Sequence, residues 1–314
     1  MRLPSSRLVH VVVLATLTAS GCERAPRPVD DDTTALLPPA VAGDTAPDAP
    51  ALNGWTLDAG PALLVAGEAQ SAVVVFPQAS GALSDTLRFD DTEIADARVD
   101  LFARTGYVGQ GTIAGGFDTS PVECTGWPRV RVIPDDRVPP NATWTVALLA
   151  DRAIALPADS IGAMSRADSS RFTTEILRLA SVIPSDPSHS FHGLPFSVRT
   201  ILRFRPEPGV EALVSDVVRR ISTEANPREE HTLIVAERDS ALAGRFELVY
   251  HERAAGPEET VVASDALAML LVGPARRPMV VLSRDDGSGT VFALLERTGR
   301  EEWRVRWSSA HSRC

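Results

Sequence analysis

The chain has 314 residues and an ordinary globular composition, with 44% hydrophobic and 23% charged residues. Its formal net charge is −10, so we expect no nucleic-acid partner, because such partners require clustered basic residues that neutralise phosphates. All 31 basic residues are arginines. The absence of lysine excludes enzymes that depend on a P-loop lysine or on a Schiff-base lysine.

The first 22 residues have the pattern of an export signal. Arg2 and Arg7 precede the apolar run Leu8–Leu17, and the small residues Ala19-Ser20-Gly21 lead to Cys22. A charged start, an apolar segment of about 7–15 residues and small residues before a cleavage site are typical of secretory signals. The run is shorter than the roughly 18 apolar residues of a membrane-spanning helix. The segment resembles the lipobox signal of bacterial lipoproteins, although Ala19 stands where that family prefers Leu.

This resemblance implies that residues 1–21 are removed and that Cys22 is acylated. Loss of Arg2 and Arg7, with no acidic residue in the removed segment, changes the net charge from −10 to −12. The lipid on Cys22 would attach the protein to a membrane of the bacterial cell envelope. Glu23, rather than the Asp that favours inner-membrane retention in enterobacterial lipoproteins, indicates the outer membrane more than the inner one, facing the periplasm or the surface. The alternative is ordinary secretion with a coincidental cysteine.

Residues 22–54 are rich in Pro, Ala, Asp and Thr, and we expect a disordered tether because they have little apolar surface to bury. About 30 flexible residues reach on the order of 30 Å, enough to hold a domain clear of a membrane. The remaining cysteines, Cys124 and Cys314, would be exported to an oxidising compartment. We expect them to form a disulfide, and two free thiols are the alternative.

Residues 55–160 contain short apolar or β-branched runs separated by Gly, Pro, Asp and Ser, which predicts an antiparallel sandwich or a small barrel. A turn is predicted at Arg104–Tyr107, and the pairs Asp90-Asp91 and Asp135-Asp136 fall at strand ends, as turn-capping acids or as acid–base or cation-binding groups. The predicted strands are Leu63–Val65, Ala72–Phe76, Thr86–Phe89, Ala97–Ala103, Tyr107–Ile113, Pro128–Val132 and Trp144–Leu149.

Residues 161–194 are predicted to form a linking helix and a loop. Asp168 is a suitable N-cap, and an apolar stripe at helical spacing follows before Pro184 ends the helix. His189 and His192 then lie in the loop. His-x-x-His can bind a metal, but no third ligand is near in the sequence, so we predict loop histidines, with no metal and no cofactor.

Residues 195–314 are predicted to form an α+β domain, in which an amphipathic helix packs on an antiparallel meander. The helix is predicted over Val210–Ala225, where the apolar residues form one stripe. The whole chain is therefore expected to be α+β and β-rich. The predicted strands are Phe196–Phe204, Thr232–Ala236, Phe246–His251, Val261–Val272, Met279–Ser283, Thr290–Leu295 and Trp303–Trp307, with a turn at Asp285–Gly289.

Two strands show alternating faces. Trp303, Val305 and Trp307 alternate with Arg304 and Arg306, which predicts that the tryptophans point to one side as core residues and the arginines to the other. Val130 and Val132 alternate with Arg129 and Arg131 in the same way. Such arginine pairs either bind a carboxylate or phosphate or form a solvated strand face.

Motifs that carry chemistry are sparse. Glu237–Asp239 and the strand after it are similar to the calcium loop of integrin-type propeller repeats, but Ser240–Ala243 stands where acidic ligands should be. Gly287-Ser288-Gly289 is a hairpin turn rather than a nucleophile elbow. His231 and His251 are possible partners of a catalytic serine, but their sequence positions do not bring them to one.

Two classes of function remain. The first is a lipid-anchored envelope protein with a non-enzymatic binding or structural role, whose partner is an envelope protein or a small ligand. The second is an envelope hydrolase whose Asp, Glu, His or Ser residues are assembled by the fold. A deep pocket with converging carboxylates or a Ser–His contact would favour the hydrolase, and a shallow polar surface with buried histidines would favour binding.

Overall fold

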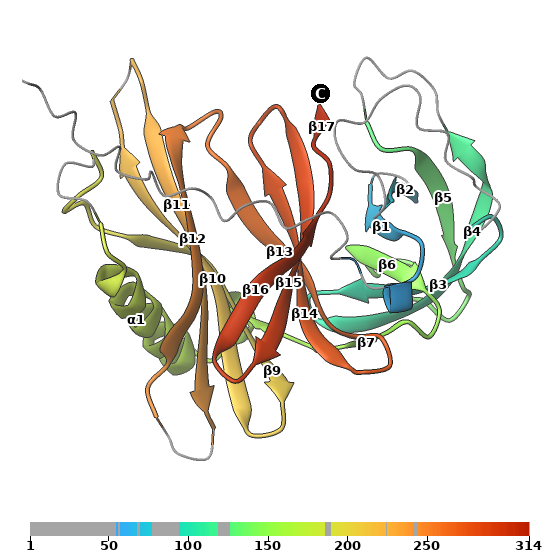
Figure 1. Cartoon of the computed structure of the whole chain (residues 1–314), viewed down its shortest axis with the longest axis horizontal. Coiled ribbons are helices and arrows are strands. Elements are labelled where there is room, and N and C mark those ends of the chain that lie inside the picture. Colours follow the sequence, from blue (N-terminus) through green and yellow to red (C-terminus); the bar gives the residue numbers. More distant parts are fainter. Residues whose placement is uncertain are drawn as a thin grey trace, which may run out of the picture. The chain divides into compact units, whose positions relative to one another are not determined.

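A computed structural model describes residues 55, 57–67, 70–76, 94–118, 126–185, 190–223, 225–240 and 244–313. These residues form a six-stranded barrel, two further antiparallel sheets and one α-helix, α1 (Figure 1). Cys22, Cys124, Cys314, His189 and the pair Asp90-Asp91 lie outside the described residues, as do the predicted leader, the predicted tether and the predicted strand Thr86–Phe89. Acylation of Cys22 and the disulfide therefore stay predictions.

The barrel is closed, with the strand order β1-β2-β5-β4-β3-β6. Val130 and Val132 of β5 point into its core, while Arg129 and Arg131 are exposed on its outer face, so the predicted alternation of this strand is confirmed. A 3₁₀ turn at Leu57–Ala59 precedes the strands. These are β1 (Leu63–Ala66), β2 (Ser71–Val75), β3 (Arg98–Ala103), β4 (Gly106–Asp118), β5 (Arg129–Pro134) and β6 (Val146–Leu149).

The other strands form two antiparallel sheets. The first sheet has the order β12-β11-β10-β9-β8, with β8 (Asp159–Ser160), β9 (Ser197–Glu207), β10 (Val210–Ile221), β11 (Arg228–Asp239) and β12 (Glu247–Pro257). The second sheet has the order β16-β15-β14-β13-β7, with β7 (Ala153–Ala155), β13 (Ala263–Val272), β14 (Arg277–Asp285), β15 (Gly289–Gly299) and β16 (Glu302–Ser308), and β17 (Ser312–Arg313) pairs with β15.

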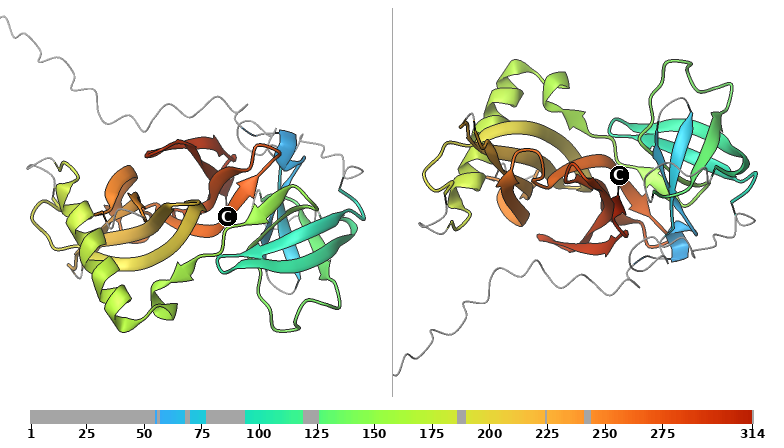
Figure 2. Two further views of the ribbon diagram at one scale, coloured as in Figure 1. Left: turned by 90° about the horizontal axis from the view of Figure 1, so that it is seen from below. Right: turned by 90° about the horizontal axis from the view of Figure 1, so that it is seen from above.

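The elements pack in layers, because most central strands are apolar on both faces. Helix α1 (Arg166–Val182) covers one face of the first sheet (Figure 2). Its Phe172 and Ile176 pack into the core between the helix and this sheet. The opposite face of the first sheet packs on the second sheet. The second sheet in turn contacts the barrel. Neighbouring residues of β14 show the division, since Val280 packs toward the first sheet and Val281 toward the barrel.

The predicted α+β arrangement of the C-terminal region is wrong. Residues 210–221 form strand β10, not a helix, and the region contains two sheets instead of a helix on a meander. The apolar residues of this segment fit a helical stripe, but they also fit a strand buried on both faces, and residues 210–219 are all buried. Its β-branched residues favour the strand. They are Val210, Val214, Val217, Val218 and Ile221.

Two local predictions also need correction. The N-cap of α1 is Ser165 rather than Asp168, and the Ser165 hydroxyl accepts a hydrogen bond from the Asp168 amide. Trp303 and Trp307 are both buried, as predicted, but they lie on opposite faces of the second sheet. The reason is a β-bulge in the β15–β16 pairing, where Leu294 faces Trp307 and Leu295 faces Val305. The extra residue reverses the alternation of faces.

Both predicted hairpin turns are confirmed. Ala103 pairs with Gly106, so Arg104 and Thr105 form the tip between β3 and β4. Asp285 pairs with Thr290 at the end of the β14–β15 hairpin.

No helix in the described ranges combines the length and apolar character needed to cross a bilayer.

Candidate functional site

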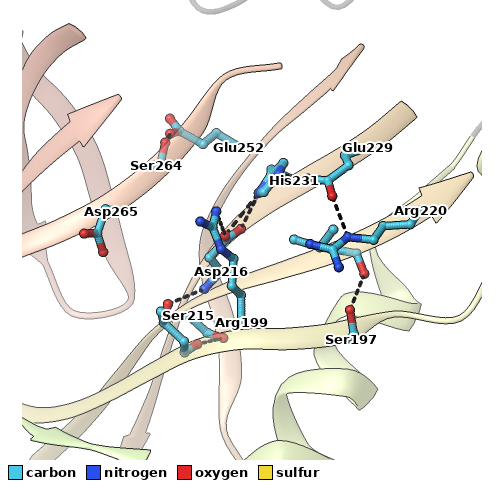
Figure 3. A network of polar contacts seen from close by, with 12 residues as sticks. Ser197, Arg199, Ser215, Asp216, Arg220, Glu229, His231, Glu252, Ser264 and Asp265 are labelled. Carbon is cyan, nitrogen blue, oxygen red and sulfur yellow. Dashed lines mark hydrogen bonds and ion pairs between the residues drawn. The ribbon is translucent and has the colours of Figure 1, made fainter. Parts of the chain in front are cut away.

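Three buried ionisable side chains meet on the face of the first sheet that looks toward the second sheet (Figure 3). They are Asp216 of β10 and Glu229 and His231 of β11, with 4%, 8% and 5% of their side chains exposed. The His231 Nδ1 atom lies 3.1 Å from Oδ2 of Asp216, and its Nε2 atom lies 2.8 Å from Oε2 of Glu229. Both ring nitrogens are therefore held by carboxylates.

An arginine covers the outer side of each carboxylate. Arg199 Nη1 lies 3.5 Å from Oδ2 of Asp216, and Arg220 Nε lies 2.5 Å from Oε1 of Glu229. More than half of each arginine side chain is exposed. The five residues form a row of alternating charge, from Arg199 through Asp216, His231 and Glu229 to Arg220, which we call the His231 ion chain (Figure 3).

The geometry of the His231 ion chain requires a second proton on the imidazole ring of His231. A neutral imidazole carries one N–H, whereas His231 faces an acceptor at each nitrogen. Burial lowers the pKa of His231, but hydrogen bonds and charge from Asp216 and then Glu229 outweigh burial and raise that pKa above 6.5. Burial raises the pKa of Glu229, but His231 and Arg220 together lower it below 4.5. The cluster is therefore an imidazolium held between two carboxylates.

In this arrangement, His231 cannot act as a general base or as a metal ligand. Neither nitrogen of His231 has a free lone pair with which to accept a proton from a nucleophile or to bind a metal. No group of three or more His, Cys, Asp or Glu residues in the described part of the chain is placed to hold a metal ion. His231, a possible partner of a catalytic serine by sequence alone, lies between two acids in the structure.

Two further acids serve internal networks. Glu252 of β12 accepts hydrogen bonds from Tyr250 and Ser264, and from Arg284 of the second sheet. Glu237, considered above as part of a calcium loop, is 2% exposed and accepts hydrogen bonds from Arg297 and from the Trp303 indole. Glu237 is therefore engaged in an ion pair between the two sheets.

A groove of about 940 Å³ lies on the outer face of the barrel. It lies over β3, β4 and the end of β5. Tyr107 and Ile133 present 55% and 42% of their surface there, more than most large apolar residues of a folded chain. Polar groups share the lining. Its residues include Arg98, Tyr107, Gln110, Thr112, Ile133 and Asp135.

A hydrogen-bonded network fixes the polar side of this barrel groove. Arg98 Nη2 donates to Gln110 Oε1 at 2.5 Å and to Asp135 Oδ2 at 3.1 Å. Gln110 Nε2 in turn donates to the buried carboxylate of Asp100 at 3.0 Å. The Tyr107 hydroxyl is 3.5 Å from the same carboxylate, and burial followed by the Asp100 charge raises the pKa of Tyr107. The groove thus combines a neutral aromatic ring with positioned donors and acceptors.

Asp135 and Asp136 were predicted as turn acids or functional acids, and both line the barrel groove. The groove as a whole was not predicted, because it depends on the pairing of β3 with β4 and of β4 with β5. The sequence signal that could have marked it is an aromatic residue, Tyr107, at the end of the predicted turn Arg104–Tyr107.

The remaining candidates serve turns and surfaces. His192 is exposed in its loop, and His311 Nε2 lies 3.2 Å from Oδ2 of Asp286. The Ser288 hydroxyl donates to Oδ1 of Asp286, as expected for a turn. Arg304 is exposed, and Arg306 Nε lies 3.8 Å from the buried Glu296. None of these contacts brings a nucleophile to a base.

No protein-family model matches this sequence, and neither the curated proteins nor the solved structures yield a match. Function therefore has to be inferred from the residues themselves.

Proposed function

We propose that this chain is a lipid-anchored envelope protein with a binding role, and that the barrel groove holds an uncharged, sugar-type ligand. The observation that carries the proposal is the exposed ring of Tyr107 beside the hydrogen-bonded set of Arg98, Gln110 and Asp135. An aromatic ring offers a flat apolar surface with a polar tip. Binding sites combine such surfaces with a few positioned polar groups.

The charges around the groove favour a neutral ligand. Arg98 is already paired with Asp135, so it offers donors without a strong unpaired positive charge. Asp96, Asp136 and Arg137 also line the groove and leave it close to neutral. With an acidic chain around it, the groove would repel phosphate-rich ligands. A sugar ring has an apolar C–H face and a rim of hydroxyl groups, and it matches both parts of the lining.

A binding role is favoured over hydrolysis because Asp135 of the barrel groove and the acidic residues of the His231 ion chain are already paired with basic residues. In a hydrolase we would expect a base with a free lone pair next to a pocket. His231, the described histidine with acids on both sides, is enclosed between sheets, and Asp135 in the groove is paired with an arginine. The paired acid in the groove and the buried, doubly hydrogen-bonded histidine together support the binding role.

The test of the groove is a binding measurement on the mature full-length protein with fully N-acetylated chito-oligosaccharide, an uncharged sugar oligomer, as the probe. Tyr107→Ala should weaken binding roughly tenfold or more, because it removes the stacking surface. Tyr107→Phe should keep most of the binding, since the ring stays. Val182→Ala, on the equally exposed end of α1, is the matched control and should bind like the parent. No binding by the parent, or equal binding by Tyr107→Ala, would overturn the proposal.

The anchor is tested separately. Cells that express the full chain are labelled with radioactive palmitate, and Cys22→Ser is compared with the parent. Label in the parent and none in Cys22→Ser is the expected result. An unlabelled parent that keeps residues 1–21 would contradict the lipid anchor. It would not bear on the proposal that the barrel groove binds a ligand.

A further inference from the structure

We propose that the His231 ion chain is a pH-sensitive clasp: a proton on His231 holds β10 against β11 near their hairpin, and loss of that proton opens one of its two carboxylate contacts. The proposal concerns a different part of the molecule from the barrel groove and does not depend on the proposed function. It rests on the positions of Asp216, His231 and Glu229.

Deprotonation has a definite consequence in this geometry. The neutral ring keeps one N–H, which can serve one carboxylate, and the other nitrogen then presents a lone pair to an anion about 3 Å away. The two carboxylates also lose the cation that they share in a buried site, where charges are poorly screened by water. This repulsion decreases only when one of the two His231–carboxylate contacts lengthens. The pairing of β10 with β11 should therefore weaken at this end.

Among the described residues, the other cations paired with Asp216 or Glu229 are Arg199 and Arg220, and neither lies between the two acids as the imidazolium does. Directly opposite His231, the neighbouring strands present the apolar Val218 and Ala254. Arg199 and Arg220 already cover the outer sides of the two acids. Helix α1 packs on the other face of the sheet, beyond reach of the ring.

The charged groups near the His231 ion chain on the facing strands form hydrogen bonds and ion pairs with other residues. Glu252 is held by Tyr250, Ser264 and Arg284. Asp265 of β13 is paired with Arg104. Glu252 and Asp265 lie near the ion chain (Figure 3), and their partners do not depend on the proton of His231.

The sign of the effect follows from the two pKa directions. Because the folded pKa of His231 is raised, its stabilisation is fully present below the unfolded value of about 6.5 and is lost as pH rises through the folded pKa. Because the pKa of Glu229 is lowered, its contribution is present above about 4.5 and is lost as pH falls through the folded pKa. The clasp is therefore closed between these limits and opens on the alkaline side of the His231 transition.

The first experiment follows the histidine ring protons of the full chain by NMR across pH 5 to 9, a range of about four units around the ordinary histidine pKa. His231→Gln assigns the resonance of His231. A transition above 6.5 is expected for His231. A His231 transition at or below 6.5 would overturn the proposal.

The second experiment measures amide hydrogen exchange of the unmodified protein on both sides of that transition, corrected for the intrinsic effect of pH. Amides of residues 216–220 and 228–232 should exchange about tenfold faster above the transition, while those of the barrel strands stay unchanged. His231→Gln, which cannot titrate, should lose this pH dependence, and His192→Gln should keep it. Exchange that is independent of pH in the parent would overturn the clasp even if His231→Gln does not fold.

Discussion

The guanidinium of Arg297 lies 2.7 Å from the carboxylate of Glu237 and joins the two sheets through their shared core. Only 6% and 2% of these side chains are exposed, and Trp303 donates its indole N–H to the same carboxylate. Arg297 also reaches Glu207 at 3.1 Å. A buried charge pair of this kind is strongly destabilising when one member is removed, because the other stays behind without compensation.

Arg297→Met should therefore lower the free energy of unfolding by about 3–5 kcal/mol. The double variant Arg297→Met/Glu237→Gln should recover much of that loss, because it removes the orphaned charge and keeps an acceptor for Trp303. Arg300→Met is the control, since its pair with Asp239 is exposed. Urea unfolding measures all three variants. A loss in Arg297→Met no larger than in Arg300→Met would mean that the pair does not hold the sheets together.

Helix α1 begins with a cap whose contribution can be isolated. The Ser165 hydroxyl accepts a hydrogen bond from the Asp168 amide at 3.1 Å and donates one to the Asp168 carboxylate at 2.9 Å. Ser165→Ala should cost about 1 kcal/mol of unfolding free energy. Ser170→Ala, within the same helix, should cost less or stabilise, because alanine is the better helix former. Equal effects of the two variants on thermal unfolding would contradict this assignment of the N-cap.

The chain contains two tyrosines, Tyr107 and Tyr250, and both should resist ionisation. Burial and then the charge and hydrogen bond of Glu252 raise the pKa of Tyr250, and burial and then Asp100 raise that of Tyr107. An alkaline titration of tyrosinate absorbance in the folded protein should therefore show no full step at the ordinary value of 10. Tyr107→Phe should leave one step, well above 10. A step at 10 in that variant would mean that Tyr250 lacks its buried contact with Glu252.

The sequence predicts much of the strand content and less of the architecture. Period-two alternation was readable in β5, where Val130 and Val132 face the core, and both hairpin turns followed from Gly and Asp positions. The predicted helix at Val210 failed because a strand buried on both faces has no polar side to reveal its period. A β-bulge moved Trp307 to the opposite face from Trp303, and bulges leave no fixed sequence mark.

The buried charged residues of the His231 ion chain could likewise be predicted only in part from the sequence. Glu229 and His231 are two residues apart on one strand, so their shared face could have been read from the sequence. Asp216 joins them only through the register that pairs Val218 with His231, and β10 had been predicted as a helix. The barrel groove likewise requires Arg98, Gln110 and Asp135 to come together from separate segments of the barrel.

Sugar binding in the barrel groove can be observed directly by titrating isotopically labelled protein with chito-oligosaccharide and following the amide NMR shifts. We expect saturable shifts confined to the barrel groove, at Arg98, at residues 107–114 and at residues 133–137, and we expect them to be lost in Tyr107→Ala. Absence of saturable shifts, or shifts centred on other strands, would contradict a binding role for the groove.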